Sequence, residues 1–485
     1  MNFARDVVER QDPGARALVE IARDGGRREW SFGEVAQCSG ALAGSLVTAG
    51  VERGDVVMTL IGNRPEWVFT MVACFRIGAV VLPCAEQLRA QDLRLRIEAT
   101  SPRAIVVDER NRAVLEEALG GRSDDVAVLS IPDESLFTAT DAAPPAVELG
   151  PEDPCLITFT SGTTGEPKAV VHMQRYLDGQ RLQAVHWLAP RAGDLVWCTA
   201  ASGWSKSARN VFIAPWIRGA AALLHDARFD PAERLELLER ERVNVLCMAP
   251  TEYRIIAKRT TLGRYDALHG LVAAGEALNP EVLANWREAT GLEPRDGYGQ
   301  TETGHLTANP VGEPARAGSM GRPLPGVRMW IEDGELVVDP ATVPTFFHGY
   351  LGEAPHDRVT AWRTGDRVWQ DDDGFLHFES RADDVIISAG YRIGPFEVES
   401  ALVSHPAVAE AAVVAAPDEE RGAVVRAIVV LRDGHADGSA LAAELQEHVK
   451  RETAPYKYPR IVEFRDELPK TASGKVRRAA LRDGA

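Results

Sequence analysis

Short runs of apolar and β-branched residues alternate with segments of helical periodicity through the first three quarters of the chain. Residues 55–61 (DVVMTLI) predict a buried strand, residues 64–78 a helix, and residues 79–84 (AVVLPC) the next strand. The same order of elements returns in residues 104–131. This alternation is typical of parallel sheets covered by helices, with the ligand site in the loops that follow the strands. We therefore expect an α/β fold.

A proline-rich connector, residues 140–154, leads into a further strand at residues 155–160. Strands at 244–250 and 271–275 continue the alternation, and a helix is expected over residues 279–291. In that helix Asn279 is the expected N-cap, Pro280 occupies the first helical position and Gly291 ends it.

The alternation of predicted strands and helices changes after residues 381–384 (RADD). A helix at 394–405 is followed by strands at 408–416 and 424–431, a helix at 441–452 and a strand at 460–465. This order predicts a small, separate α+β domain. Because 485 residues are too many for one compact core, we expect an N-terminal domain over residues 1–382 and a C-terminal domain over 384–485, with the boundary at Asp383.

Charge and composition narrow the function classes. The chain has 54 basic and 71 acidic residues, a net charge of −17, which argues against general binding to nucleic acid or anionic membranes. The N-terminus lacks the apolar core of a signal peptide, and charged residues interrupt the apolar stretches near 55–85 too soon for a membrane span. The six cysteines show no C-x-x-C pairing, so we expect buried, reduced thiols in a cytoplasmic protein.

The loop TFTSGTTGEPKAVV (residues 158–171) directly follows a predicted strand. A Walker loop is excluded because Pro167 precedes Lys168 and Ala169 follows it, and the dinucleotide pattern G-x-G-x-x-G is absent from the loop. Small residues still allow backbone N–H groups to approach phosphate oxygens, and the lysine adds a charge. The alternative is a flexible surface turn.

Three further stretches carry candidate chemistry. In residues 295–304 (RDGYGQTETG), the ring of Tyr298 suits a base and the carboxylate of Glu302 suits a metal, although glycine-rich loops after helices are common. In the Thr-Gly-Asp turn, Asp366 suits ribose hydroxyls, whereas residues 370–374 (QDDDG) favour a solvated hairpin turn over a metal site. Residues 468–478 (LPKTASGKVRR) are basic, and their alternative interpretation is a solvated tail.

In this order and at these separations, the four stretches resemble the adenylate-forming superfamily, which includes acyl-CoA synthetases, carrier-protein adenylation domains and firefly luciferase. The similarity covers residues 25–482, and segments 204–220, 388–408 and 456–478 are most similar to the medium-chain acyl-CoA synthetases. The resemblance implies a large N-terminal domain with two α/β sheets and a small β-barrel, followed by a small, mobile α+β C-terminal domain hinged at Asp383.

The implied activity is that of an AMP-forming acyl-CoA synthetase, with ATP and CoA as co-substrates and Mg²⁺ as cofactor. A carboxylic acid is converted to an acyl-adenylate with loss of pyrophosphate, and a thiol then attacks the adenylate. Acetate-specific relatives carry a tryptophan where this chain has Gly299, so a medium-chain or aryl acid is expected. Trp204 is expected to form a wall or gate of the acyl pocket; its alternative role is core packing.

The resemblance also assigns individual residues. Thr160, Glu302 and Lys475 are the catalytic set, with Glu302 as the Mg²⁺ ligand and Lys475 bridging the acid and the α-phosphate during adenylation. The triphosphate loop comprises Thr160, Ser161, Gly162, Thr163, Thr164, Gly165 and Lys168. The remaining ATP-binding set comprises Gly275, Glu276, Ala277, Asp296, Gly297, Tyr298, Gly299, Gln300, Thr301, Asp366 and Arg381.

Rotation at Asp383 is expected to withdraw Lys475 and bring Gly390 towards the pantetheine channel, with Arg392 in contact with CoA. A structural ion pair between Arg381 and Asp383 is the alternative for these two residues.

Two rival functions stay open: an acyl-AMP ligase that loads a carrier protein, and a non-catalytic acyl-nucleotide-binding module of the same fold. The turn around Gly390 favours CoA, and the joint presence of the five charged motif residues argues against a non-catalytic module. The expected partners are therefore small molecules, without nucleic acid. The oligomeric state is left open, a homo-oligomer included.

Overall fold

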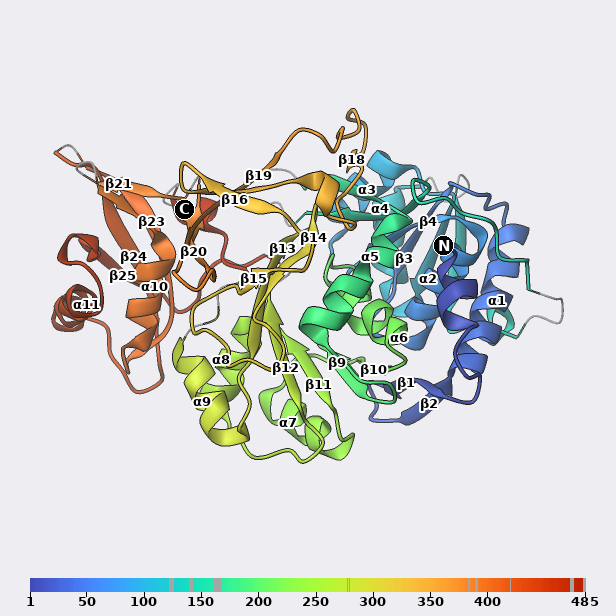
Figure 1. Cartoon of the computed structure of the whole chain (residues 1–485), viewed down its shortest axis with the longest axis horizontal. Helices are drawn as coiled ribbons and strands as arrows, with labels where there is room; N and C mark the ends of the chain where they lie inside the picture. Colours follow the sequence, from blue (N-terminus) through green and yellow to red (C-terminus); the bar gives the residue numbers. More distant parts are fainter. Residues whose placement is uncertain are drawn as a thin grey trace.

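The computed structural model describes residues 1–121, 126–138, 143–160, 167–276, 278, 280–382, 384–388, 391–418, 420–471 and 475–482, with the backbone alone described at residues 280, 281 and 392. Within these ranges the chain forms two large mixed sheets, a smaller antiparallel sheet and a C-terminal unit (Figure 1).

The first large sheet contains seven described strands in the order β18-β8-β7-β4-β3-β5-β6. The parallel strands are β3 (Val56–Leu60), β4 (Val80–Cys84), β5 (Ala104–Asp108), β6 (Ala127–Ile131) and β7 (Pro154–Phe159). The antiparallel edge consists of β8 (Ala169–Met173) and β18 (Gly349–Tyr350). Its helices include α2 (Pro65–Ile77), α3 (Ala90–Thr100) and α4 (Arg112–Leu119).

The second large sheet contains nine described strands in the order β15-β14-β13-β12-β11-β9-β10-β1-β2. The run from β13 to β1 is parallel: β13 (Arg295–Gln300), β12 (Gly270–Ala274), β11 (Val245–Met248), β9 (Leu195–Cys198), β10 (Ala221–His225) and β1 (Arg16–Ile21). The edges are antiparallel: β14 (Gly304–Ala308), β15 (Arg322–Pro323) and β2 (Arg27–Ser31). The expected parallel sheets therefore have antiparallel edges.

Helices cover both large sheets and fill the space between them. Around the first and second sheets the chain forms η1 (Ala4–Val8), α1 (Phe32–Thr48), α5 (Arg175–Gln183), η5 (Ala184–Leu188), η6 (Arg209–Ile213), α6 (Ala214–Ile217), α7 (Pro231–Arg240), α8 (Pro250–Arg259) and α9 (Pro280–Thr290). Helix α2 is apolar almost all round because it lies in the main core, where Trp67 meets Phe212 edge to face. Gly78 then ends α2 in the left-handed conformation.

A third sheet occupies the place of the expected small barrel. Its four antiparallel strands are β16 (Met329–Glu332), β17 (Glu335–Val338), β19 (Trp362–Gln370) and β20 (Leu376–Arg381). Residues 371–374 form the tight turn between β19 and β20, in which the Asp371 N–H donates to the Phe375 carbonyl at 3.0 Å. The prediction of a solvated hairpin turn is confirmed.

The C-terminal unit stands at one end of the molecule, beside β20 (Figure 1). It comprises β21 (Ile386–Ser388), β22 (Tyr391–Ile393), α10 (Pro395–Ser404), β23 (Val408–Asp418), β24 (Gly422–Leu431), α11 (Ser439–Glu452), β25 (Ile461–Phe464) and α12 (Arg478–Arg482). Two core clusters in this unit contain only residues beyond 385. The α+β pattern is confirmed, while the boundary at Asp383 stays a prediction because that residue lies outside the described ones.

Several local predictions have clear outcomes. Gly291 ends α9 at φ +79°, and its N–H donates to the Arg287 carbonyl at 2.9 Å; Asn279 lies outside the described residues. All six cysteines are free, and five of them are buried, as expected. None of the described helices combines the length and apolar character that crossing a bilayer requires.

Candidate active site

The described ends of the phosphate-loop stretch hold each other in place. The Thr160 N–H donates to the Lys168 carbonyl at 2.9 Å, and the Lys168 N–H donates to the Thr160 hydroxyl at 2.9 Å. The loop therefore starts where β7 ends and closes before β8 begins. Lys168 is exposed, and its Nζ lies 4.5 Å from the centre of the Tyr350 ring.

Glu302 contacts the hydroxyl of the same tyrosine, whereas Lys168 lies by its ring. The Tyr350 hydroxyl donates to Glu302 Oε1 at 3.0 Å, and the Phe347 N–H donates to the Glu302 carbonyl at 2.7 Å. Burial, followed by the charge of Glu302, raises the pKa of Tyr350, so the phenol remains a donor. Tyr350 therefore links a cation and a carboxylate that come from different loops.

Asp366, on β19, lies at the centre of a second cluster, which joins the β19–β20 pair to β13. Its carboxylate accepts hydrogen bonds from the Tyr298 hydroxyl, from Gln300 Nε2 at 2.9 Å and from Arg381 Nη1 at 2.9 Å. Asp366 and Arg381 are also register partners in the sheet. Burial and the adjacent carboxylate raise the pKa of Tyr298 well above its usual value. The sequence placed these four residues together, and the structure does the same.

A third cluster places Lys475 of the C-terminal segment near the carboxyl end of β12, in the nine-stranded sheet. Lys206 Nζ lies 3.4 Å from the Ala274 carbonyl, to which it donates, and a Cβ built on Gly275 would lie 3.1 Å from it. Removal from water and then the charge of Lys206 lower the pKa of Lys475, while Glu276, Asp366 and Arg381 act on it more weakly. Lys475 therefore lies within electrostatic range of Glu276, Asp366 and Arg381, which the motifs name, and of Lys206, which they do not.

Two of these residues were missed by sequence reasoning. Lys206 is a lysine in an otherwise uncharged loop after a buried strand, and that isolation was the available signal. Tyr350 carried no local signal, because β18 is far from Glu302 and Lys168 in sequence and meets them only through the sheet.

The glycine-rich strand β13 is shaped by its neighbour β14. A Cβ at Gly297 would lie 2.4 Å from His305 Nε2, and a Cβ at Gly299 would lie 1.8 Å from the Gly304 carbonyl oxygen. Glycine at 299 is therefore required by the bulged turn itself, in addition to any effect on an acyl pocket.

Two other motif residues stabilise the surrounding loops. Asp296 is buried, its Oδ1 accepts from the Gly297 N–H at 2.9 Å, and burial raises the pKa of its carboxyl well above the usual range. The Thr301 hydroxyl donates to Ser205 Oγ at 3.3 Å. The 203–208 loop thus contacts the motif loop directly.

Trp204 is half-buried and packs against the core of the seven-stranded sheet. Its carbonyl accepts from the Ser207 hydroxyl at 2.6 Å. The preceding Gly203 has φ +91°, and a Cβ there would lie 2.2 Å from the Ala85 backbone nitrogen. The loop is therefore held tightly against β4, which suits both a pocket wall and core packing.

Some predicted residues lie outside the described ones. These are Ser161, Gly162, Thr163, Thr164 and Gly165 of the phosphate loop, Ala277, Asp383 and Gly390, together with the side chain of Arg392. Among the described residues, no group of three or more histidine, cysteine, aspartate or glutamate side chains is arranged to hold a metal ion.

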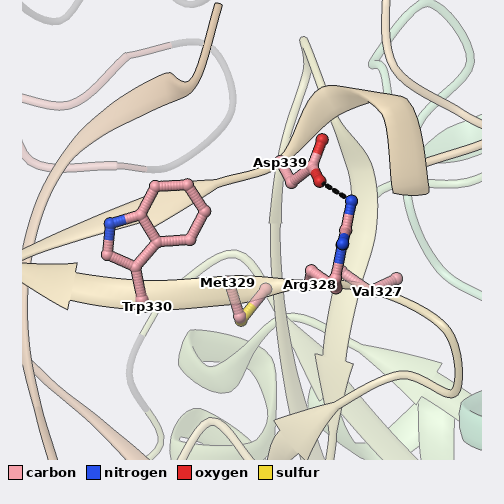
Figure 2. A pocket seen from close by; sticks show the side chains of 5 residues that line it. All are labelled: Val327, Arg328, Met329, Trp330 and Asp339. Atoms are coloured by element: carbon pink, nitrogen blue, oxygen red, sulfur yellow. Dashed lines mark hydrogen bonds and ion pairs between the residues drawn. The ribbon is translucent and has the colours of Figure 1, made fainter. Parts of the chain in front are cut away.

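Two hollows on the described surface lie apart from these clusters. One, of about 540 Å³, is lined by Val327, Arg328, Met329, Trp330 and Asp339 on the third sheet, with an ion pair between Arg328 and Asp339 (Figure 2). The other, of about 820 Å³, is lined by residues such as Arg191 and Arg242, which precede strands β9 and β11 of the nine-stranded sheet. Neither contains a predicted site residue.

Two protein-family matches together cover most of the chain. Residues 4–351 match the AMP-binding enzyme family, and residues 397–475 match the AMP-binding enzyme C-terminal domain. The chain belongs to the AMP-binding enzyme family. This membership agrees with the superfamily that the four motifs resemble.

Several known proteins are similar to this chain over most of their length. The chain is 40% identical to the uncharacterized acyl-CoA ligase YtcI of Bacillus subtilis, over 96% of this chain and 92% of that protein. It is 39% identical to the human mitochondrial acyl-coenzyme A synthetase ACSM4, over 99% and 90%. The crystal structure of the anthranilate CoA ligase AuaEII in complex with anthranoyl-AMP superposes with a TM-score of 0.87 at 27% identity, over 99% and 97%.

Proposed function

We propose that this protein is an AMP-forming acyl-CoA synthetase that activates a medium-chain or aryl carboxylic acid. The observation that carries the proposal is that Lys475, from the C-terminal unit, comes within electrostatic range of four residues from distant parts of the chain. These are Lys206 and Glu276, in the loops after β9 and β12, and Asp366 and Arg381, on β19 and β20. The names of the relatives, acyl-CoA ligase and acyl-coenzyme A synthetase, support the same assignment. A catalytic lysine from the C-terminal unit has no evident use in a pure binding module.

The first step joins two anions, a carboxylate and the α-phosphate of ATP. Catalysis of such a step is largely positioning and charge neutralisation. In our proposal the ammonium of Lys475 bridges the two reacting groups, Lys168 and the 161–165 loop hold the outer phosphates, and Thr160 shapes the start of that loop. The Asp366 carboxylate, already fixed by Arg381, then accepts from the ribose hydroxyls.

Adenine is proposed to stack on the Tyr298 ring, next to Gly275, Glu276 and Ala277. The hydroxyl of Tyr298 is tied to Asp366, so the base and the ribose would be held by one hydrogen-bonded unit. Asp296, Gly297, Gln300 and Thr301 complete this set mainly by fixing the strand and its turn.

Glu302 fits a magnesium site of the kind that ATP brings with it. Mg²⁺ keeps several waters and is commonly bound by one or two carboxylates together with substrate phosphates. Glu302 is a single carboxylate close to the Tyr350–Lys168 contact, which suits such a shared site. When bound, Mg²⁺ would neutralise phosphate charge; Glu302 would orient it and Tyr350 would hold Glu302.

For the second step we propose that the C-terminal unit rotates at Asp383. Lys475 would leave, and Gly390 and Arg392 would approach the CoA thiol and phosphate. Such a rotation would allow one site to catalyse adenylation first and thioester formation second. Trp204 and the bulged turn at Gly299 are proposed to border the acyl group.

The test is AMP release from ATP, with and without CoA, across straight-chain acids from acetate to palmitate plus benzoate. We expect CoA-dependent release that is greatest at intermediate chain length or with benzoate. Acyl-adenylate formation without any CoA thioester product would instead indicate a carrier-protein acceptor. Absence of AMP release with every acid would contradict the proposed function.

A further inference from the structure

Arg209 is a buried cation, and none of the residues that the structure describes forms an ion pair with it. Only 6% of the residue is exposed. Its Nε has no hydrogen-bond partner, although the guanidinium shares a hydrogen bond with the Tyr176 hydroxyl. Burying a guanidinium away from water is unfavourable unless an anion compensates it.

Two other buried arginines have partners of a different kind: Arg234 has a carboxylate, and Arg96 has a backbone carbonyl and an aromatic ring. Arg234 pairs with Glu252 at 3.3 Å and lies 4.6 Å from the centre of the Trp197 ring. Arg96 donates to the Asp92 carbonyl at 2.7 Å and lies over the Phe159 ring. Arg209 has no equivalent partner in the described part of the chain.

Uncharged polar groups surround Arg209, from four elements. Gln183 Nε2 donates to Asn210 Oδ1 at 3.1 Å, which leaves Gln183 Oε1 without a partner. His172 and His305 are within electrostatic range of Arg209, both are buried, and nitrogens of both rings lack partners. Buried polar groups are usually satisfied, so such a concentration indicates that a polar group from outside the chain belongs there.

This cluster, defined as His172, Tyr176, Gln183, Arg209, Asn210 and His305, begins directly behind the motif loop. His305 is the register partner of Gly299, and its Nε2 occupies the space next to Gly297. His172 lies against the backbone of Thr301. Arg209 itself follows the 203–208 loop, which carries Trp204 and Lys206. The cluster therefore adjoins the region in which the acid must lie.

We propose that Arg209 binds a second carboxylate at the far end of the acid substrate, so that the enzyme prefers dicarboxylic acids. This inference rests on the proposed function. A guanidinium matches a carboxylate with two parallel hydrogen bonds. One carboxylate is activated near Lys475 while the other is held by the Arg209 cluster.

Pyrophosphate exchange into ATP measures the first step without CoA and tests the inference with matched acids. The pairs are hexanoate and adipate, octanoate and suberate, and 4-methylbenzoate and terephthalate. We expect kcat/KM to be at least about tenfold higher for the dicarboxylate of the best pair. In Arg209→Leu that ratio should fall at least about tenfold, with the monocarboxylate unchanged or improved.

Arg234→Leu is the matched control, because it removes another buried guanidinium and should lower stability without changing the ratio. Thermal melting identifies any variant that fails to fold. If Arg209→Leu fails to fold, the inference is tested by the dicarboxylate-to-monocarboxylate ratio of kcat/KM in the wild type and in Arg209→Lys.

A wild-type preference for the monocarboxylate in all three pairs would overturn the inference and leave the proposed function intact. An unchanged ratio in folded Arg209→Leu would do the same and indicate that Arg209 serves Tyr176 and water only. Failure of every acid to support exchange would contradict the proposed function and the inference with it.

Discussion

Replacing Asp366 by asparagine removes the charge from the centre of a buried hydrogen-bonded cluster. The Asp366 side chain is only 6% exposed and accepts from Tyr298, Gln300 and Arg381. The amide of an asparagine presents one oxygen and two N–H groups. One of the three donors would therefore face another donor, and the Arg381 charge would lose its partner.

The magnitude follows from these contacts. A hydrogen bond to a charged group contributes about 1.5–3 kcal/mol net. The remaining oxygen still accepts one or two donors, and the Arg381 side chain is 39% exposed, so water screens much of its unpaired charge. We expect Asp366→Asn to lower the free energy of unfolding by about 2–4 kcal/mol and to raise the KM for ATP at least about tenfold, because the proposed ribose acceptor is also lost.

Urea unfolding and initial-rate kinetics at varied ATP measure the two effects. Asp373→Asn is the matched control: it lies in the turn of the same hairpin, its side chain is 63% exposed, and its pair with Arg316 is on the surface. That variant should change stability by about 0.5 kcal/mol or less. If Asp366→Asn matched the control in both stability and KM, the structural role given to this cluster would be wrong.

Three further predictions concern single residues. Lys475→Ala should abolish adenylation but spare thioester formation from supplied acyl-adenylate; equal loss of both would contradict its role. Because the site lowers the pKa of Lys475, wild-type adenylation should fall, and stability should rise, as pH increases through that lowered pKa towards the ordinary value near 10.5. Gly299→Ala should lower stability by about 3 kcal/mol, since its Cβ would meet the Gly304 carbonyl, whereas Gly263→Ala, with open space, should be neutral in the same unfolding assay. Burial lowers the pKa of His172 to about 3, so stability should fall as pH drops below about 6.5, and His172→Gln should weaken that slope in unfolding titrations at pH 7 and 5; an unchanged slope would contradict this.

Most elements could be predicted from the chain pattern because each is encoded locally. The strand at 55–61 and the helix at 64–78 appear as β3 and α2, each shorter by one residue at either end. The antiparallel edges were not predicted, since strand direction depends on which neighbour a strand reaches after its turn. Strand β18, only two residues long, offers no period to detect.

The candidate site divides in the same way. Thr160, Tyr298 and Asp366 were identified because they stand in long motifs whose residue types match nucleotide chemistry. Lys206 and Tyr350 became visible only through their contacts with Ala274 and Glu302. The reason given for glycine at 299 also needed the structure, which shows a carbonyl oxygen in the place of a side chain.

The sequence by itself determined the α/β class, the change of pattern near residue 383 and the likeness to adenylate-forming enzymes, and it named the residues proposed to bind the nucleotide. These are properties of local periodicity and of contiguous motifs. Tertiary structure alone decided that Lys475 comes within electrostatic range of Lys206, that Tyr350 joins Lys168 to Glu302, and that Arg209 is buried with no carboxylate partner among the described residues. Such facts depend on which distant segments come into contact and on which partners each charged group has once it is buried. The spacing of residues along the chain specifies neither.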